Sequence, residues 1–98
     1  MKILLERSGG FAGLIMTATL DTAQLSPQEL AEVQPCIAAA NLFESPESFL
    51  SQQPDRFQYR FEVTDGDRHH SITFGESAVP AHLRPLLDWL VPHLRGNR

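Results

Sequence analysis

The chain lacks the features that define several large classes of protein. It has a single cysteine, Cys36, among its 98 residues, so no disulfide can form within it and a disulfide-stabilised secreted scaffold is excluded. No apolar stretch approaches the roughly 18 residues of a transmembrane helix. The apolar run at residues 3–5 ends at Glu6 and Arg7, well short of a signal peptide. We therefore expect no membrane partner and a cytoplasmic location.

Positive charge is also scarce. Eight Lys and Arg residues stand against twelve Asp and Glu residues, and the formal net charge is −4. Proteins that bind nucleic acids neutralise phosphates with clustered Lys and Arg. The basic residues here are scattered, so no nucleic-acid partner is expected. The 42% of hydrophobic residues is ordinary for a globular protein, and the length predicts one domain over residues 1–98.

Motifs that carry catalysis or bind metals are missing from the sequence. His69 and His70 are adjacent on a predicted strand, so their side chains point to opposite faces and cannot chelate one ion together. Ser8-Gly9-Gly10 lacks the lysine and the following helix of a phosphate-binding loop. We expect no catalytic residue, no cofactor and no metal. The rival hypothesis is a small hydrolase built on His69, Glu62 and Asp65.

An antiparallel hairpin is predicted at the start of the chain. Residues 3–7 and 14–21 have the composition of strands, and a glycine-rich segment separates them. Alternation places one set of side chains on one face of the second strand, Leu14, Met16, Ala18 and Leu20, and the other set on the opposite face, Ile15, Thr17, Thr19 and Asp21.

A second hairpin is predicted in the other half. Residues 57–64 alternate apolar with polar side chains, and Asp65-Gly66 is a strong signal for a type I′ turn. With these two residues at the turn centre, Phe61 would face His70. Ile72 would then share the face of the aromatic row, so the two strands agree on one buried face.

A helix is predicted after each hairpin. The first begins at a capping box, with Ser26 as N-cap and Glu29 three residues later. Pro35 falls on the solvent side of this helix, and we expect it to kink the helix or divide it in two. The second helix is predicted within residues 79–94 from a stripe of leucines, with Pro85 bending or ending it.

The order ββαββα favours an α+β fold. Its simplest form is a four-stranded antiparallel sheet with two helices packed on one face, while the other face stays in water. Phe43, Phe49 and Leu50 would anchor the irregular connection at residues 41–56. The predicted core contains Phe57, Tyr59, Phe61, Ile72, Phe74, Leu87 and Leu90.

Three parts of the sequence resemble the emfourin family of small bacterial proteins. They are ERSGGFAG at residues 6–13, DRFQYR with VTDG at residues 55–60 and 63–66, and VPAHLRPLLDWL at residues 79–90. Together they span nearly the full chain in the family's order. The resemblance implies a proteinaceous inhibitor of protealysin-like, thermolysin-family zinc metalloproteases. The alternative is a non-catalytic adaptor that binds another partner through the same loops.

A protease-binding surface is expected at the loop of the first hairpin. Phe11 is a large apolar residue in a glycine-rich loop, which could fill a partner's pocket or fold back onto its own sheet. The resemblance implies a target that favours large apolar side chains just after the scissile bond. We therefore expect the loop to occlude the cleft, with the 65–67 turn adding polar contacts from the same end of the sheet. The candidate residues are Ser8, Gly9, Gly10, Phe11, Ala12, Gly13, Asp65, Gly66 and Asp67.

A plain hairpin is the alternative interpretation of the glycine-rich loop. In that case its glycines serve only to supply the positive φ angles that the turn requires.

Overall fold

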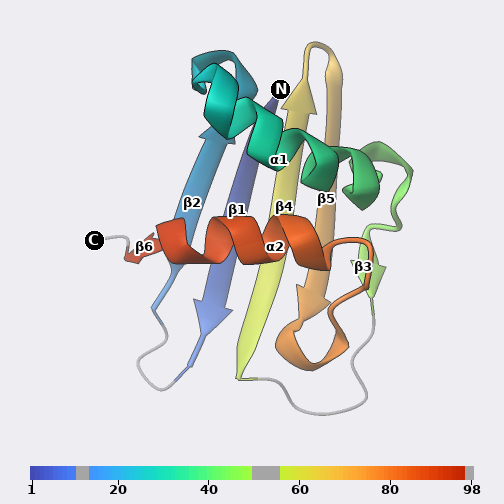
Figure 1. Cartoon of the computed structure of the whole chain (residues 1–98). Coiled ribbons are helices and arrows are strands. Elements are labelled where there is room, and N and C mark those ends of the chain that lie inside the picture. Colours follow the sequence, from blue (N-terminus) through green and yellow to red (C-terminus); the bar gives the residue numbers. More distant parts are fainter. Residues whose placement is uncertain (11–13, 50–55, 97–98) are drawn as a thin grey trace.

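One sheet with two helices on it makes up the structure, a computed structural model that describes residues 1–10, 14–49 and 56–96 (Figure 1). Short 3₁₀ turns, η1 (Thr22–Gln24), η2 (Leu42–Glu44), η3 (Glu76–Ala78) and η4 (Val91–His93), connect several of the elements. The strands and helices are β1 (Lys2–Gly9), β2 (Met16–Asp21), α1 (Pro27–Ala40), β3 (Ser48–Phe49), β4 (Phe57–Asp65), β5 (Arg68–Gly75), α2 (Arg84–Leu90) and β6 (Arg95–Gly96).

The sheet has six strands in the order β3-β5-β4-β1-β2-β6. The predicted hairpins are its four central strands, and all three pairings among these are antiparallel. The prediction of a four-stranded, purely antiparallel sheet in the order ββαββα is wrong, because β3 runs parallel to β5 and β6 extends the other edge. Both added strands have only two residues, which is too short to show an alternating pattern.

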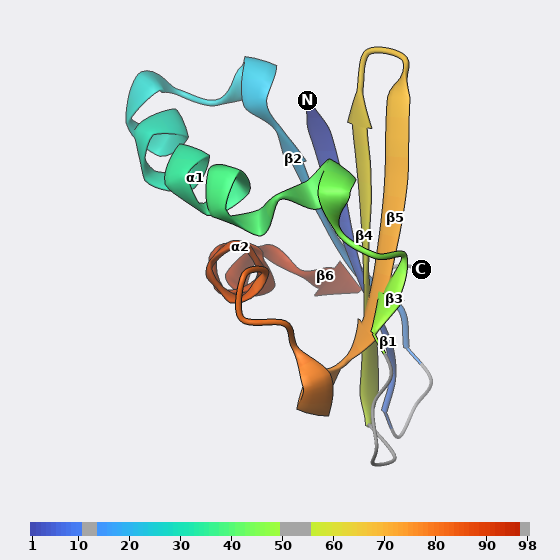
Figure 2. The same ribbon diagram turned by 90° about the vertical axis from the view of Figure 1, so that its right-hand side faces the viewer.

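Both helices lie on the same face of the sheet, as Figure 2 shows in an edge-on view. This arrangement confirms the predicted layers. The opposite face carries polar side chains, among which Arg60 lies 3.5 Å from Glu6 and 3.4 Å from Glu62. An antiparallel sheet can leave one face in water in this way, because alternate side chains of each strand point away from the core.

The core is formed between the sheet and the helices. Of the predicted members, only Phe57 lies outside it: this ring is half-buried at the start of β4, and the guanidinium carbon of Arg7 lies 4.7 Å from its centroid. Phe57 shares the buried face, but it lies near the end of the sheet, past the rows that the helices cover. The largest fully buried side chains are Phe61, Phe74, Ile3, Leu5, Ile72, Leu83, Leu86, Leu90, Val33 and Val63.

The turn between β4 and β5 is centred one residue later than predicted. Asp65 pairs with Arg68, so Gly66 and Asp67 form the two-residue loop. Of these two, only Gly66 has a positive φ, 62°. A type I′ turn needs positive φ at both central residues, whereas a type II′ turn needs it only at the first, where glycine is preferred.

The change of turn centre leaves the buried face unaltered. Phe61 faces Ile72 instead of His70, a shift of two residues along β5. Because side chains alternate with a period of two, an even shift keeps every side chain on its predicted face. Ile72 and Phe74 are therefore buried, as the alternation predicted.

Helix α1 begins at the predicted capping box. The hydroxyl of Ser26 accepts a hydrogen bond from the N–H of Glu29, and the Glu29 carboxylate accepts one from the N–H of Ser26; both are 3.1 Å long. Pro35 is exposed, as expected, but the helix is one continuous element and is not divided. The carbonyl that loses its helical donor belongs to Ala31, which is also exposed, so water can satisfy it.

Helix α2 is shorter than the predicted stripe of leucines. It starts at Arg84 and ends at Leu90, with Pro85 in its first turn, where the missing N–H costs no helical hydrogen bond. Leu94 still packs against the core from the segment after η4. The leucine stripe therefore marks residues that face the sheet, although α2 covers only seven residues of that segment.

The buried ring of Phe61 provides a test of the core. Replacing it with alanine should destabilise the protein by about 3–5 kcal/mol, because both the transfer energy of the ring and the energy of the cavity are lost. Urea denaturation followed by circular dichroism measures this change. Gln58→Ala, on the exposed face of the same strand, is the control and should cost under about 0.5 kcal/mol. A loss of less than about 1 kcal/mol for Phe61→Ala would contradict the packing described here.

The capping box predicts a pH dependence of stability. The hydrogen bond from the Ser26 N–H lowers the pKa of Glu29, so the charged carboxylate favours the folded state. This contribution is complete above the unfolded pKa and is lost as the pH falls through the lower, folded pKa. Thermal melting of the wild type and of Glu29→Gln should differ most near neutral pH and converge in acid. Gln28→Ala, at an exposed and uncharged position in the same turn, is the control, and its difference from the wild type should not change with pH.

Candidate functional site

The loop of the first hairpin starts from a fixed backbone conformation. Gly9 and Gly10 have positive φ angles of 103° and 84°, which only glycine adopts without strain. The N–H of Gly10 donates a 2.8 Å hydrogen bond to the carbonyl of Arg56. A Cβ atom on Gly9 would overlap that same carbonyl oxygen, and one on Gly10 would lie 2.9 Å from the Phe57 ring. The glycines therefore hold the beginning of the loop against β4, as the plain-hairpin interpretation requires.

Two apolar side chains on the other side of the loop face solvent. Leu14 is 60% exposed and Ile15 is 45% exposed, and they are the exposed large hydrophobic residues within the described part of the chain. Both residues were predicted to lie in a strand over residues 14–21. That start is wrong, because β2 begins only at Met16; Ala18 and Leu20, predicted to share a face, are both buried.

Phe11, Ala12 and Gly13 lie outside the described residues. Their predicted role therefore stays a prediction, and the site can be described only through its neighbours. We call these neighbours the loop-end surface, defined as Gly9, Gly10, Leu14, Ile15 and Phe57.

Arg7 supports the loop-end surface from β1. Its guanidinium stacks on Phe57, and its Nη2 lies 3.0 Å from the sulfur of Met16. Arg7 thus links β1 to both of its neighbouring strands just before the loop. Such a cation–π contact is worth about 0.5–1 kcal/mol at an exposed position.

The second predicted part of the site lies at the far end of the sheet. Gly9 pairs with Phe57 at one end of the β1–β4 ladder, while Lys2 pairs with Thr64 at the other. Seven residue steps at about 3.3 Å separate these ends by about 23 Å. The 65–67 turn therefore lies beside the amino terminus, whose nitrogen is 3.9 Å from the carboxylate of Asp65. The expectation that it lies at the same end as the glycine-rich loop is wrong.

The residues of the rival hydrolase hypothesis are not brought together. His69 pairs with Thr64 on the exposed face, and Glu62 instead forms an ion pair with Arg60. Asp65 points to the amino terminus. No group of three His, Cys, Asp or Glu side chains that could hold a metal ion occurs among the described residues. Among the described residues, no hydrogen bond or ion pair joins His69, Glu62 and Asp65 to one another.

A polar cluster around Ser45 was missed by sequence reasoning. The carbonyl of Ser45 lies 2.6 Å from His70 Nε2, and its hydroxyl lies 3.0 Å from His82 Nε2 and 3.0 Å from the carbonyl of Asn41. Since a carbonyl only accepts, His70 must donate from Nε2. The cluster joins α1, β5 and the start of α2 through residues far apart in sequence, so no local pattern could reveal it.

The arrangement defines a small α+β domain with an apolar, exposed loop end. None of the described helices has the length and apolar character to cross a bilayer. Proteins that expose large apolar side chains beside a loop commonly use them to bind other proteins.

The chain belongs to the emfourin family, whose model matches residues 5–91. This finding confirms the resemblance identified from the three sequence segments. Searches among curated proteins and among solved structures found no match. Membership in this family implies a role of the protease-inhibitor type.

The conformation of Gly9 can be tested by adding a single methyl group. Gly9→Ala should destabilise the protein by about 1–3 kcal/mol, because its Cβ would overlap the Arg56 carbonyl at a positive φ. Chemical denaturation measures the loss. Gly96→Ala is the matched control, since a Cβ there meets no atom within 4 Å, and its stability should be close to that of the wild type. Equal stability of both variants would show that the loop does not require this conformation.

Proposed function

We propose that this protein inhibits a thermolysin-family, protealysin-like zinc metalloprotease by placing the loop of its first hairpin in the active-site cleft. Two observations support the proposal. The chain belongs to the emfourin family, and Leu14 and Ile15 expose apolar surface beside the loop that contains Phe11. The exposure of Leu14 and Ile15 is the reason for proposing this loop as the binding surface.

The exposed side chains suit a cleft that accepts large apolar groups. Burying a Leu or Ile side chain against a partner contributes about 1.5–3 kcal/mol. Phe11 precedes Leu14 by only three residues in the sequence, and large apolar side chains of this kind dominate many protein interfaces. The apolar groups of the partner's cleft would replace the water that now contacts Leu14 and Ile15.

The backbone at the loop start favours inhibition over cleavage. A substrate must enter a protease cleft as an extended strand, yet Gly9 and Gly10 depart from extended geometry through their positive φ angles. The hydrogen bond from Gly10 to Arg56 and the pairing of β1 with β4 oppose straightening of the loop. A loop held in this way can occupy the cleft without presenting a peptide bond in the geometry for attack.

The contacts proposed for Asp65, Gly66 and Asp67 require a longer interface. A partner that reaches both the loop-end surface and this turn must span about 23 Å along the sheet. Stable interfaces of ordinary size bury about 800 Å² on each partner, which allows such a span. We propose the turn as a peripheral contact only, because its side chains are polar and exposed.

Inhibition assays on loop variants test the proposal. Phe11→Ala should weaken inhibition of a protealysin-like protease about 30- to 1,000-fold, the loss expected for a buried aromatic anchor. Leu14→Asp should also weaken inhibition, because a carboxylate would replace an apolar contact with the protease. Asp67→Ala, in the peripheral turn, should change inhibition less than about fivefold. Gln34→Ala, exposed on α1 and outside both proposed contacts, is the control and should leave inhibition unchanged.

Each variant must first show the circular dichroism spectrum and melting of the wild type. Unchanged inhibition by folded Phe11→Ala and Leu14→Asp would rule out this loop as the anchor. If the wild type inhibits no protease of this family, the adaptor function becomes the better explanation.

A further inference from the structure

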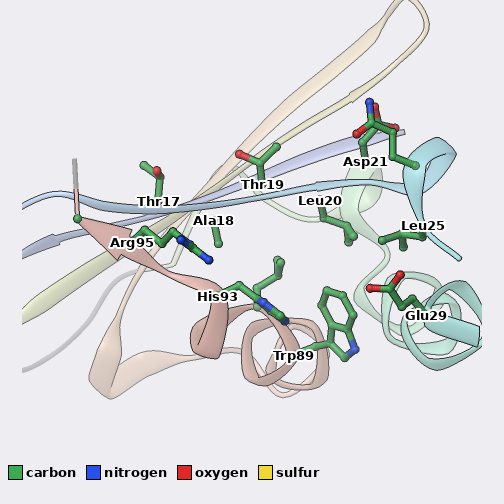
Figure 3. Close-up of a pocket in the computed structure, with 13 residues that line it drawn as sticks. Thr17, Ala18, Thr19, Leu20, Asp21, Leu25, Glu29, Trp89, His93 and Arg95 are labelled. Atoms are coloured by element: carbon green, nitrogen blue, oxygen red, sulfur yellow. The ribbon is translucent and has the colours of Figure 1, made fainter. Parts of the chain in front are cut away.

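A second surface, distinct from the loop end, lies along the outer edge of β2 (Figure 3). Here β2, the start of α1 and the end of α2 enclose a groove of about 690 Å³, which we call the edge groove. Its volume falls within the range of sites that bind ligands. The residues that line it include Thr17, Thr19, Asp21, Glu29, Trp89 and Arg95.

The edge of β2 is only partly paired. β6 pairs with Met16 and Thr17. The segment before it, η4, is not a strand, so no described strand pairs with Thr19 on this side. The N–H of Thr22 donates to the carbonyl of Met1, which makes these two a hydrogen-bonded pair of the β1–β2 ladder. In an antiparallel ladder such pairs alternate, so Thr19 directs its N–H and C=O outward.

The opposite edge of the sheet is protected. There β3 pairs with β5 at Thr73 and Phe74, and His70 bonds to the carbonyl of Ser45. The guanidinium carbon of Arg68 lies 3.9 Å from the centroid of the Phe43 ring. Because native proteins usually block exposed strand edges, the open stretch at Thr19 is a position where another chain can pair.

The groove has a basic and an acidic end. Arg95 and His93 point into it from the β6 side, and Glu29 points in from α1, with the Trp89 ring between them (Figure 3). The Trp89 ring lies against His93, with centroids 5.2 Å apart. The Asp21 carboxylate lies on the other face of β2, where it accepts a 3.0 Å hydrogen bond from the N–H of Ala23.

These charges select a direction for a bound strand. A segment antiparallel to β2 would begin near Asp21 and end near Thr17, because β2 runs from Met16 to Asp21. Its carboxyl end would therefore approach Arg95. β6 already occupies the edge at Thr17, so the segment cannot continue as a strand and must stop or turn away there.

We propose that the edge groove binds the extended carboxyl terminus of a partner protein, added antiparallel to β2. The free carboxylate would contact Arg95. Because side chains of a strand alternate, the residue before the last would face Trp89, and a basic residue three positions before the end would lie on the same face, near Glu29. Backbone hydrogen bonds to Thr19 would supply affinity that does not depend on sequence. This proposal does not depend on the inhibitor function, since it concerns another surface and its test uses no protease.

A short peptide tests this recognition directly. The probe is acetyl-Lys-Thr-Val-Val with a free carboxylate, which places Lys and the penultimate Val on one face. Its control is the same peptide with a carboxamide end. Trp89 is the only tryptophan, so its fluorescence reports binding in the groove. The free acid should bind about two- to fivefold more tightly than the amide, as expected for one exposed ion pair. Equal binding of the two peptides, or no change in fluorescence with either, would overturn the proposal.

Two arginine variants distinguish binding in the groove from non-specific attraction between the protein and the charged peptide. Arg95→Ala should abolish the preference for the free acid, whereas Arg84→Ala, an exposed arginine at the start of α2, should keep it. Thr19→Pro should weaken the binding of both peptides, because it removes the N–H that would donate to their backbone. Proline is tolerated at an edge strand, so the fold should be kept. A preference that survives in Arg95→Ala would contradict the assigned direction.

A second copy of this chain is the alternative occupant of the same edge. Sedimentation of the wild type and of Thr19→Pro separates the two cases. A dimer that dissociates in Thr19→Pro would show that a second copy of this chain fills the groove, and would overturn the proposed partner terminus. A monomer in both cases leaves the edge free for the peptide.

Discussion

Antiparallel pairing of β1 with β4 joins two hairpins that lie more than thirty residues apart in the chain, and the other features of the molecule depend on it. Each hairpin alone has only two strands, which is marginally stable in water. The pairing sets Leu5 opposite Phe61 and Ile3 opposite Val63, so that both hairpins turn their apolar faces to the same side. The two helices can then cover one continuous apolar surface.

The same pairing organises the exposed regions. It brings the Arg56 carbonyl against Gly9 and Gly10, and so fixes the start of the loop. It also sends the two hairpin turns to opposite ends of the sheet, because β1 and β4 run in opposite directions. A surface centred on Leu14 and Ile15 is therefore apolar and separate from the polar turn at Asp65.

Much of the fold could be predicted from local patterns. The alternation of residues 57–64 located β4, and Ser26 with Glu29 located the start of α1. The positive φ angles of Gly9 and Gly10 also followed from residue type. The strands β3 and β6 could not be predicted, because their partners lie elsewhere in the chain and two residues have no period. Leu14 was misplaced for a related reason: alternation shows which face a strand residue takes but not where the strand begins.

The amino-acid sequence by itself determined the secondary structure of the long elements, the buried face of each strand and membership of the emfourin family. These properties follow from residues close together in the chain, whose spacing matches the period of a helix or a strand. Only the tertiary structure decided which loops share an end of the sheet, how Ser45 joins two distant histidines, and that Trp89, Glu29 and Arg95 line one groove beside Thr19. Those relations arise from pairing and packing between segments far apart in the chain, so their geometry exists only once the sheet has formed and the helices have packed on it.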